Sequence, residues 1–221
     1  MKKILSFILL GATSLVASAQ ISSLDELSSD KAYTIYNPFY TTYAVYNAEK
    51  STSLVWAAGM TASDKTIADQ SYTTPFNAAD PSSSWMIVPF NDQWFVYNLG
   101  AKKFMAVGHT AANASTASAK LQDTPVAVEF TSNGNGGFHL RSYDGNQNFL
   151  CAAPQLSYPI SIWTSADNGS TWKIEENAQV QADYETCLKK LKEAFPETVA
   201  LKIDTRHGYV WSTKNGGPMP E

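Results

Sequence analysis

Charged residues are scarce in this chain. Only 16% of its 221 residues are charged, and the formal net charge is −4. Because the sequence has no run of lysines and arginines, it lacks the basic surface that nucleic acids and anionic membranes attract. We therefore expect no nucleic-acid partner.

Cysteine is almost absent as well. The two cysteines, Cys151 and Cys187, cannot form the disulfide framework that holds small secreted domains together. A hydrophobic core must therefore stabilise the fold. The sequence leaves open whether the two cysteines form one disulfide bond or remain buried free thiols.

Long apolar runs are missing, with one short exception at the start. The chain begins MKKILSFILLGATSLVASAQ, in which Lys2 and Lys3 precede the apolar segment 4–10 and small residues occupy 17–19. This order is typical of a secretory signal peptide, and the apolar segment is too short for a membrane anchor. We predict a signal peptide over 1–19, cleavage near Ala19, a secreted or periplasmic protein and no membrane span.

Motifs of known catalytic chemistry are also absent. The three histidines lie far apart at His109, His139 and His207, so no zinc-protease motif exists. No nucleophile elbow and no phosphate-binding glycine loop before a helix appear, and the carboxylates are scattered. We predict a non-catalytic protein without catalytic residues, metal site or cofactor, and a hydrolase that uses two of the scattered carboxylates is the last alternative.

What the sequence does contain is a long series of short strands. Between 31 and 176, about ten segments such as YTIYN, WFVYN and FHLRS alternate apolar and polar residues. Turn-forming Asn, Asp, Gly and Pro residues separate them. Strands without intervening helices predict an all-β domain over 31–176, preceded by a lead-in at 20–30.

Three segments of this domain share one order of strands. Each has an aromatic strand, a tight turn, a second strand and a closing strand that starts with an aromatic residue. The closing aromatics are Trp85, Phe130 and Trp172, with spacings of 130 − 85 = 45 and 172 − 130 = 42. Three such units predict a β-trefoil, in which six strands close a barrel and three hairpins cap it. An ordinary β-sandwich with similar hairpins remains the alternative.

The matching apolar positions of the three units support the same repeat. Ile35, Val96 and Leu140 precede Val45, Met105 and Leu150 by ten, nine and ten residues respectively. The first unit also contains an extended polar segment, from about Gly59 to Ser84, which reads as a long surface loop.

After Glu176 the periodicity changes from that of strands to that of a helix. Apolar residues recur every three or four positions in DYETCLKKLKEAFPE, which predicts an amphipathic helix within 177–196. Asp183 can cap its start and Pro196 can end it. We expect a short strand, VALKI, and a loose tail over 197–221.

The stretch ISIWTSADNGSTWKI, residues 160–174, resembles the end of a unit in ricin-type β-trefoil lectins. There an aromatic side chain stacks on a sugar, a loop asparagine and an earlier aspartate bind hydroxyls, and a closing tryptophan lies in the core. The resemblance implies that Trp163 and Asn168 bind a ligand and that Trp172 is core, and the neighbouring Asp167 offers a further polar group for the ligand. Ala152 stands where the earlier aspartate is expected, and Trp163 could instead fill space beneath the hairpins.

A second stretch, FVYNLGAKKFMAVG at 95–108, resembles trefoil domains in exported proteins of Bacteroides-type bacteria. Together the two resemblances imply a non-catalytic module that binds carbohydrate or a glycoconjugate. A protein-binding trefoil such as a protease inhibitor, with the loop from Gly59 to Ser84 as its contact, is the alternative, as is an accessory domain of a hydrolase.

Overall fold

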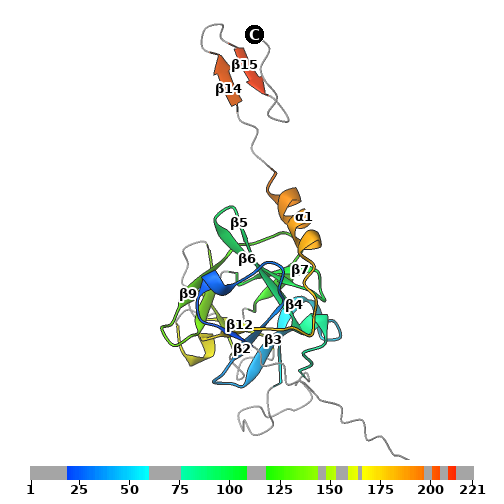
Figure 1. Cartoon of the computed structure of the whole chain (residues 1–221). Coiled ribbons are helices and arrows are strands. Elements are labelled where there is room, and N and C mark those ends of the chain that lie inside the picture. Colours follow the sequence, from blue (N-terminus) through cyan, green and yellow to red (C-terminus); the bar gives the residue numbers. More distant parts are fainter. Residues whose placement is uncertain are drawn as a thin grey trace, which may run out of the picture.

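The computed structural model describes residues 19–59, 76–108, 118–143, 148–152, 159–163 and 166–196, and the backbone of 201–204 and 209–212. Figure 1 shows short strands wrapped into a barrel, with one helix, α1 (Tyr184–Ala194), beside it. The predicted signal peptide falls almost wholly outside the described residues. Gln20, predicted to begin the mature chain, starts strand β1 (Gln20–Ile21), which pairs with the barrel.

Six strands form the barrel, two from each repeat unit. They are β2 (Tyr33–Asn37), β5 (Trp85–Phe90), β6 (Gln93–Asn98), β9 (Val128–Ser132), β10 (Phe138–Ser142) and β13 (Lys173–Glu176). Three antiparallel pairs alternate with three single-residue pairings, Tyr33 with Trp85, Trp94 with Val128, and Phe138 with Trp172. The ring of strands is thereby closed, which leaves no exposed barrel edge.

Three hairpins cap one end of this barrel. They are β3 (Thr42–Asn47) with β4 (Ser51–Ala58), β7 (Lys103–Ala106) with β8 (Lys120–Gln122), and β11 (Phe149–Cys151) with β12 (Ser161–Trp163). Their backbones meet in a cyclic set of hydrogen bonds. Val55 N–H donates to the Ala119 carbonyl (3.0 Å), Ala119 to Ile160 (2.8 Å), and Ile160 back to Val55 (2.8 Å). This threefold arrangement confirms the predicted β-trefoil and excludes the β-sandwich.

The register of the hairpins repeats in all three units. Ala44 pairs with Ala57, Met105 with Leu121, and Leu150 with Ile162, and all six side chains are buried. The first unit therefore contributes Ala44 to this core layer. The prediction of Val45 at this place was wrong, because Val45 lies one residue further along, on the opposite face of the strand, in a separate cluster with Trp56 and Ala58.

The closing strands require a similar correction. Trp85 pairs with Asn98 and Val128 pairs with Ser142, at the same place in two successive units. Phe130 pairs with Leu140, and Ile87 pairs with Val96, so Phe130 is equivalent to Ile87 and not to Trp85. Val128, not Phe130, therefore matches Trp85 and Trp172, and the true spacings are 128 − 85 = 43 and 172 − 128 = 44.

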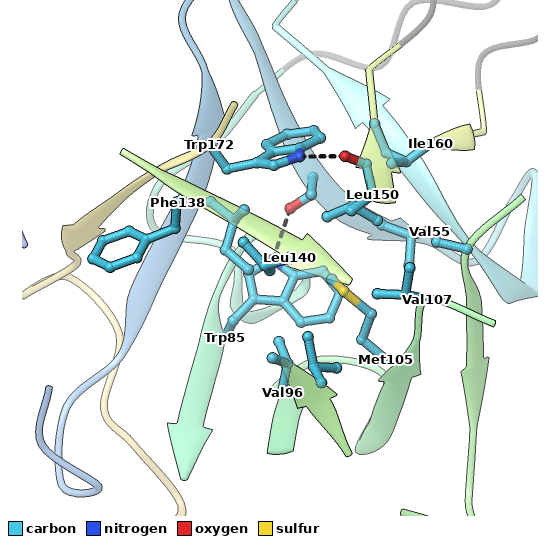
Figure 2. Packing of buried hydrophobic residues seen from close by; sticks show 14 of the residues in the cluster. Val55, Trp85, Val96, Met105, Val107, Phe138, Leu140, Leu150, Ile160 and Trp172 are labelled. Atoms are coloured by element: carbon cyan, nitrogen blue, oxygen red, sulfur yellow. Dashed lines mark hydrogen bonds between the residues drawn. The ribbon is translucent and has the colours of Figure 1, made fainter. Parts of the chain in front are cut away.

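The two closing tryptophans fill the centre of the core, as Figure 2 shows. Both are fully buried. The indole N–H of Trp85 donates to the Ala44 carbonyl (2.7 Å), and that of Trp172 to the Leu150 carbonyl (2.8 Å). Since Ala44 and Leu150 are equivalent residues, the same bond ties barrel to cap in two units, and the prediction that Trp172 is core is confirmed.

Beyond the barrel, the helix begins where the sequence predicts. Asp183 caps α1 by accepting the Thr186 N–H (3.3 Å). Cys187 and Leu191 of the apolar stripe are buried, whereas Ala194 is exposed. The expected strand exists as β14 (Leu201–Asp204), and it pairs with β15 (Tyr209–Ser212), a strand in what was predicted to be a loose tail.

Three single turns of 3-10 helix connect strands in the described part of the chain. They are η1 (Leu24–Glu26), η3 (Pro81–Ser83) and η4 (Asn168–Ser170).

The two cysteines do not form a disulfide bond. Cys151 and Cys187 are both buried free thiols. Burial raises the pKa of each thiol to about 12, which makes both unreactive as nucleophiles.

Candidate functional site

The threefold register creates three equivalent surfaces on the outside of the molecule. Directly paired residues of an antiparallel sheet share a face, and each surface contains one barrel residue and two cap residues. The unit-1 face has Tyr36, Tyr43 and Ala58, the unit-2 face Tyr97, Phe104 and Gln122, and the unit-3 face Arg141, Phe149 and Trp163.

A ring from the long first-unit segment covers the unit-1 face. Phe76 stacks on Tyr43 with 3.6 Å between ring centroids and 10° between the planes. Residues 60–75 of that segment, where most of the predicted loop lies, fall outside the described residues. Phe76 nevertheless places an apolar ring where a ligand of this face would sit.

Helix α1 covers the unit-2 face. Tyr97 and Phe104 are at most 1% exposed and share one buried cluster with Cys187 and Leu191 of the helix. The Lys190 ammonium lies 5.8 Å from the centre of the Tyr97 ring and donates to the Lys102 carbonyl (2.5 Å). The helix thus occupies the surface that a ligand of unit 2 would need.

The unit-3 face differs from the other two in having no such cover among the described residues. Within the described part of the chain, no helix and no ring from another unit lies over it. Trp163 ends β12 opposite Phe149 and is half-buried, in contrast to the fully buried Trp172. An aromatic ring that keeps part of its surface in water can stack on the C–H face of a ligand.

Polar groups surround the two aromatic rings of the unit-3 face. The Arg141 Nη2 lies 2.6 Å from Glu129 Oε1, while the buried Arg141 Nε has no partner among the described residues. His139 meets Phe149 edge to face, with 5.7 Å between centroids, and its Nε2 lies 3.3 Å from Thr171 Oγ1. A ring platform bordered by donors and acceptors is the composition of a shallow site for a polar ligand.

The electrostatics of this face favour neutral histidine. Partial burial lowers the pKa of His139, and the nearby Asp167 carboxylate opposes that shift only in part. Since the unshifted value is about 6.5, the imidazole is neutral at pH 7. It then offers one donor and one acceptor nitrogen.

The other two predicted ligand residues, Asp167 and Asn168, lie at the start of η4. Asp167 caps this turn, and its Oδ1 accepts the backbone N–H of Ser170 (3.0 Å) and the Ser170 hydroxyl (3.2 Å). Asp80 caps η3 in the same way in unit 1, where its Oδ1 accepts the Ser82 N–H (2.8 Å). Asp167 therefore also has a structural role, while the exposed Asn168 side chain has no hydrogen-bond partner among the described residues.

The residue that replaces the expected aspartate is buried. Ala152 is 3% exposed, and its N–H donates to the Gly169 carbonyl (2.8 Å). Ala152 belongs to the main hydrophobic cluster of the core. A carboxylate at 152 would be buried among apolar side chains, which is costly without a partner, so any ligand of this face must bind through other polar groups.

Sequence reasoning missed the barrel contribution to this face. The strand FHLRS alternates, so its buried Phe138 and Leu140 imply that His139 and Arg141 share the outer side. That signal was available in the sequence. Their neighbours Glu129 and Phe149 could be recognised only from the pairing of strands.

Neither a cluster of metal ligands nor a helix able to span a membrane is found among the described residues. Among them, no three His, Cys, Asp or Glu side chains gather in a way that could hold a metal ion. Their only helices are too short or too polar to qualify as a candidate membrane span.

Comparison with known proteins agrees with the fold and does not identify a family. No protein-family profile and no curated protein sequence matches the chain. Among solved structures, the ricin B-like lectin of Macrolepiota procera in complex with lactose is 15% identical, with a TM-score of 0.51, and the match covers 67% of this chain and 97% of that one.

A mosquitocidal holotoxin is similar over 68% of this chain, with 12% identity and a TM-score of 0.50. The match covers 18% of the toxin chain, so the similarity concerns one part of a much larger protein. At these identities the likeness extends to the fold alone. The chain is a β-trefoil, with the same fold as a ricin B-like lectin.

Proposed function

We propose that this protein is an exported, non-catalytic module that binds carbohydrate or a glycoconjugate at the unit-3 face. One observation supports this proposal above the others. Of three equivalent outer faces, that of unit 2 is covered by α1 and the Tyr43 ring of unit 1 is stacked under Phe76, whereas no described ring of another unit and no described helix lies over the half-exposed Trp163 of unit 3.

The chemistry of the face suits a sugar. The C–H face of a pyranose ring stacks on an aromatic side chain, and its hydroxyls need fixed hydrogen-bonding partners. Trp163 provides the stacking surface. The amide of Asn168 and the second carboxylate oxygen of Asp167 provide acceptors, and the Arg141–Glu129 pair provides charged groups at the border.

The comparisons favour the same ligand class. The ricin B-like lectin with this fold was solved with lactose bound, which makes β-galactosides suitable first probes. Export is part of the proposal, because the predicted signal peptide would be cleaved just before Gln20, the first residue of β1. N-terminal sequencing of the protein from the culture medium or periplasm tests this step.

The central experiment is a printed array of defined oligosaccharides, followed by calorimetric titration of each binder. We expect Trp163→Ala to abolish binding while the protein stays folded. Tyr143→Ala is the matched control, because Tyr143 is another exposed ring in unit 3, with 50% of its surface accessible. Recovery of the oligosaccharide unchanged after incubation would support a non-catalytic role, and an array without binders would refute the proposal.

A further inference from the structure

A second hollow lies where three turns of the chain meet. The β2–β3 turn, the β9–β10 turn and η4 border a cavity of about 380 Å³. Its lining includes the ring of Phe39, the amides of Asn135 and Asn168, and the side chains of Thr171 and Lys173. The Trp163 ring is not part of this lining, so the hollow is distinct from the stacking surface of the unit-3 face.

Phe39 is the most exposed large apolar side chain among the described residues. Its accessible fraction is 57%, and the edge of Tyr40 supports it with 4.8 Å between ring centroids. Exposure of a phenylalanine at the tip of a turn forgoes the hydrophobic stabilisation that burial would give. The position is explained if the ring binds a ligand.

The turn that carries Phe39 is held rigidly. The buried Asn37 amide group donates to the carbonyls of Gly169 and Thr171 (both 2.9 Å), and its oxygen accepts the Tyr40 N–H (2.9 Å). One side chain thus joins the turn to the segment that carries Asn168. A ring fixed before binding loses little conformational entropy when a ligand arrives.

The opposite wall is also fixed. Asn133 Oδ1 accepts the N–H groups of Asn135 (3.0 Å) and Gly137 (3.1 Å). Gly136 has φ +67°, and its carbonyl accepts Gln20 Nε2 at 2.7 Å. This network leaves the Asn135 side chain without a hydrogen-bond partner among the described residues.

We infer that the Phe39 hollow is a second saccharide subsite, which takes a further sugar ring of the oligosaccharide bound at the unit-3 face. The ring of Phe39 would stack on the pyranose, and the amide of Asn135 would bind its hydroxyls as both donor and acceptor. The inference takes its ligand class from the proposed function.

The two sites adjoin each other through one side-chain contact. Thr171 lines the hollow, and its hydroxyl lies 3.3 Å from the His139 ring nitrogen on the unit-3 face. A ligand longer than one sugar ring can therefore extend from one site to the other. This predicts that affinity depends on the chain length of the oligosaccharide.

The test compares two variants with two probes. The probes are the strongest-binding oligosaccharide of the array and the methyl glycoside of its terminal sugar, titrated by calorimetry. Phe39→Ala should weaken binding of the oligosaccharide about tenfold, the upper range for one aromatic contact, and leave the methyl glycoside unaffected. Trp163→Ala should weaken binding of both.

The possible results separate the two proposals. If Trp163→Ala abolishes binding and Phe39→Ala changes nothing, the subsite is refuted and the proposed function stands. If only Phe39→Ala weakens binding, the hollow binds saccharide and the unit-3 face does not. If neither variant matters, both proposals are wrong.

Two further variants guard against a false result. Phe39→Trp keeps an aromatic ring and should retain oligosaccharide affinity, while its added fluorescence should shift on binding of the oligosaccharide and not of the methyl glycoside. Asn135→Ala removes an amide that no described residue uses, and it should weaken the same complex without loss of fold. Circular dichroism confirms that each variant is folded.

Discussion

The outer faces of units 2 and 3 occupy the same place in the fold and have opposite chemistry. The unit-2 face has Met86, Val88, Phe95, Tyr97, Phe104 and Gln122, and the unit-3 face has Glu129, Thr131, His139, Arg141, Phe149 and Trp163 at the six matching positions. The first two residues of each set come from the closing strand of the preceding unit. Five of the six residues of the unit-2 face are buried. The unit-3 residues include an ion pair, an imidazole and a half-exposed indole.

The difference follows from what lies on each face. Helix α1 removes the unit-2 face from water, so apolar residues there add stability. Nothing among the described residues does so for the unit-3 face, where the side chains of Glu129, Thr131, His139, Arg141 and Trp163 all stay partly exposed. The strand register that specifies the fold therefore leaves the chemistry of each outer face free to vary.

The largest expected effect is a difference in stability between the two faces. Phe104 is fully buried under the helix, and Phe104→Ala should lower the free energy of unfolding by about 3–5 kcal/mol. The equivalent Phe149→Ala should cost less, because Phe149 keeps 7% of its surface exposed and packs against the polar His139 ring instead of a helix. Urea titration of both variants measures the difference, and equal losses would mean that the unit-3 face is as well covered as that of unit 2.

The helix itself offers the next test. Leu191→Ala should cost about 2–5 kcal/mol, because Leu191 is fully buried against the unit-2 face. Leu188→Ala is the control, since Leu188 is only half-buried on the same helix. Glycan binding at the unit-3 face should be unchanged in both folded variants, and loss of binding would indicate that the helix takes part in the site.

A smaller effect is expected at the buried amides that fix the turns. Asn98 Nδ2 donates to the Ser82 carbonyl (3.0 Å), its oxygen accepts the Ala101 N–H (2.8 Å), and unit 3 has Ser142 at the same place. Asn98→Ser should cost about 1–3 kcal/mol, because it leaves buried backbone groups unpaired. The reverse change, Ser142→Asn, shows whether the amide also fits unit 3. If Asn98→Ser leaves the free energy of unfolding unchanged, the hydrogen bonds of the Asn98 side chain are not needed for stability.

Much of the fold could be predicted from sequence because the repeat is strong, but its register could not. Side chains alternate with a period of two, so Val128 and Phe130 point to the same side and either could match Trp85. Tyr43, Ala44, Val45 and Tyr46 are all apolar or aromatic, so alternation could not place Ala44 in the core. Only the pairing with distant strands decides these positions.

The site was predictable to a lesser degree. Trp163 and Asn168 were found by resemblance to a lectin unit, and the structure places both at partly or fully exposed positions. The capping role of Asp167 could have been suspected, because it stands five residues before Trp172 as Asp80 stands before Trp85. The Phe39 hollow depends on three turns from distant parts of the chain, which no local pattern brings together.

Trp163 provides the test that separates ligand binding from stability. Trp163→Ala should lower the free energy of unfolding by about 1 kcal/mol, the usual loss for a residue that is only partly buried. Trp172→Ala should cost about 3–5 kcal/mol because it empties the core. If Trp163→Ala costs as much as Trp172→Ala, Trp163 is a core residue and the unit-3 face loses its stacking surface.

The smallest expected effect concerns His139, which matches Phe95 in unit 2. Partial burial lowers the pKa of His139 in the folded chain below the value of about 6.5 that it has when unfolded. Between these two values the unfolded chain binds a proton that the folded chain does not, so stability falls as the pH decreases through this window and stays level below it.

His139→Gln removes this contribution and keeps a polar side chain beside Thr171 and Phe149. The free energy of unfolding should therefore decrease less between pH 8 and pH 5 in the variant than in the wild type. Every other ionisable group is the same in the two proteins, so the comparison at each pH isolates the contribution of His139. A wild type that gains stability relative to the variant at pH 5 would mean that Asp167 stabilises the charged imidazole, and that the unit-3 face presents a cation, not a neutral ring, to its ligand in acid.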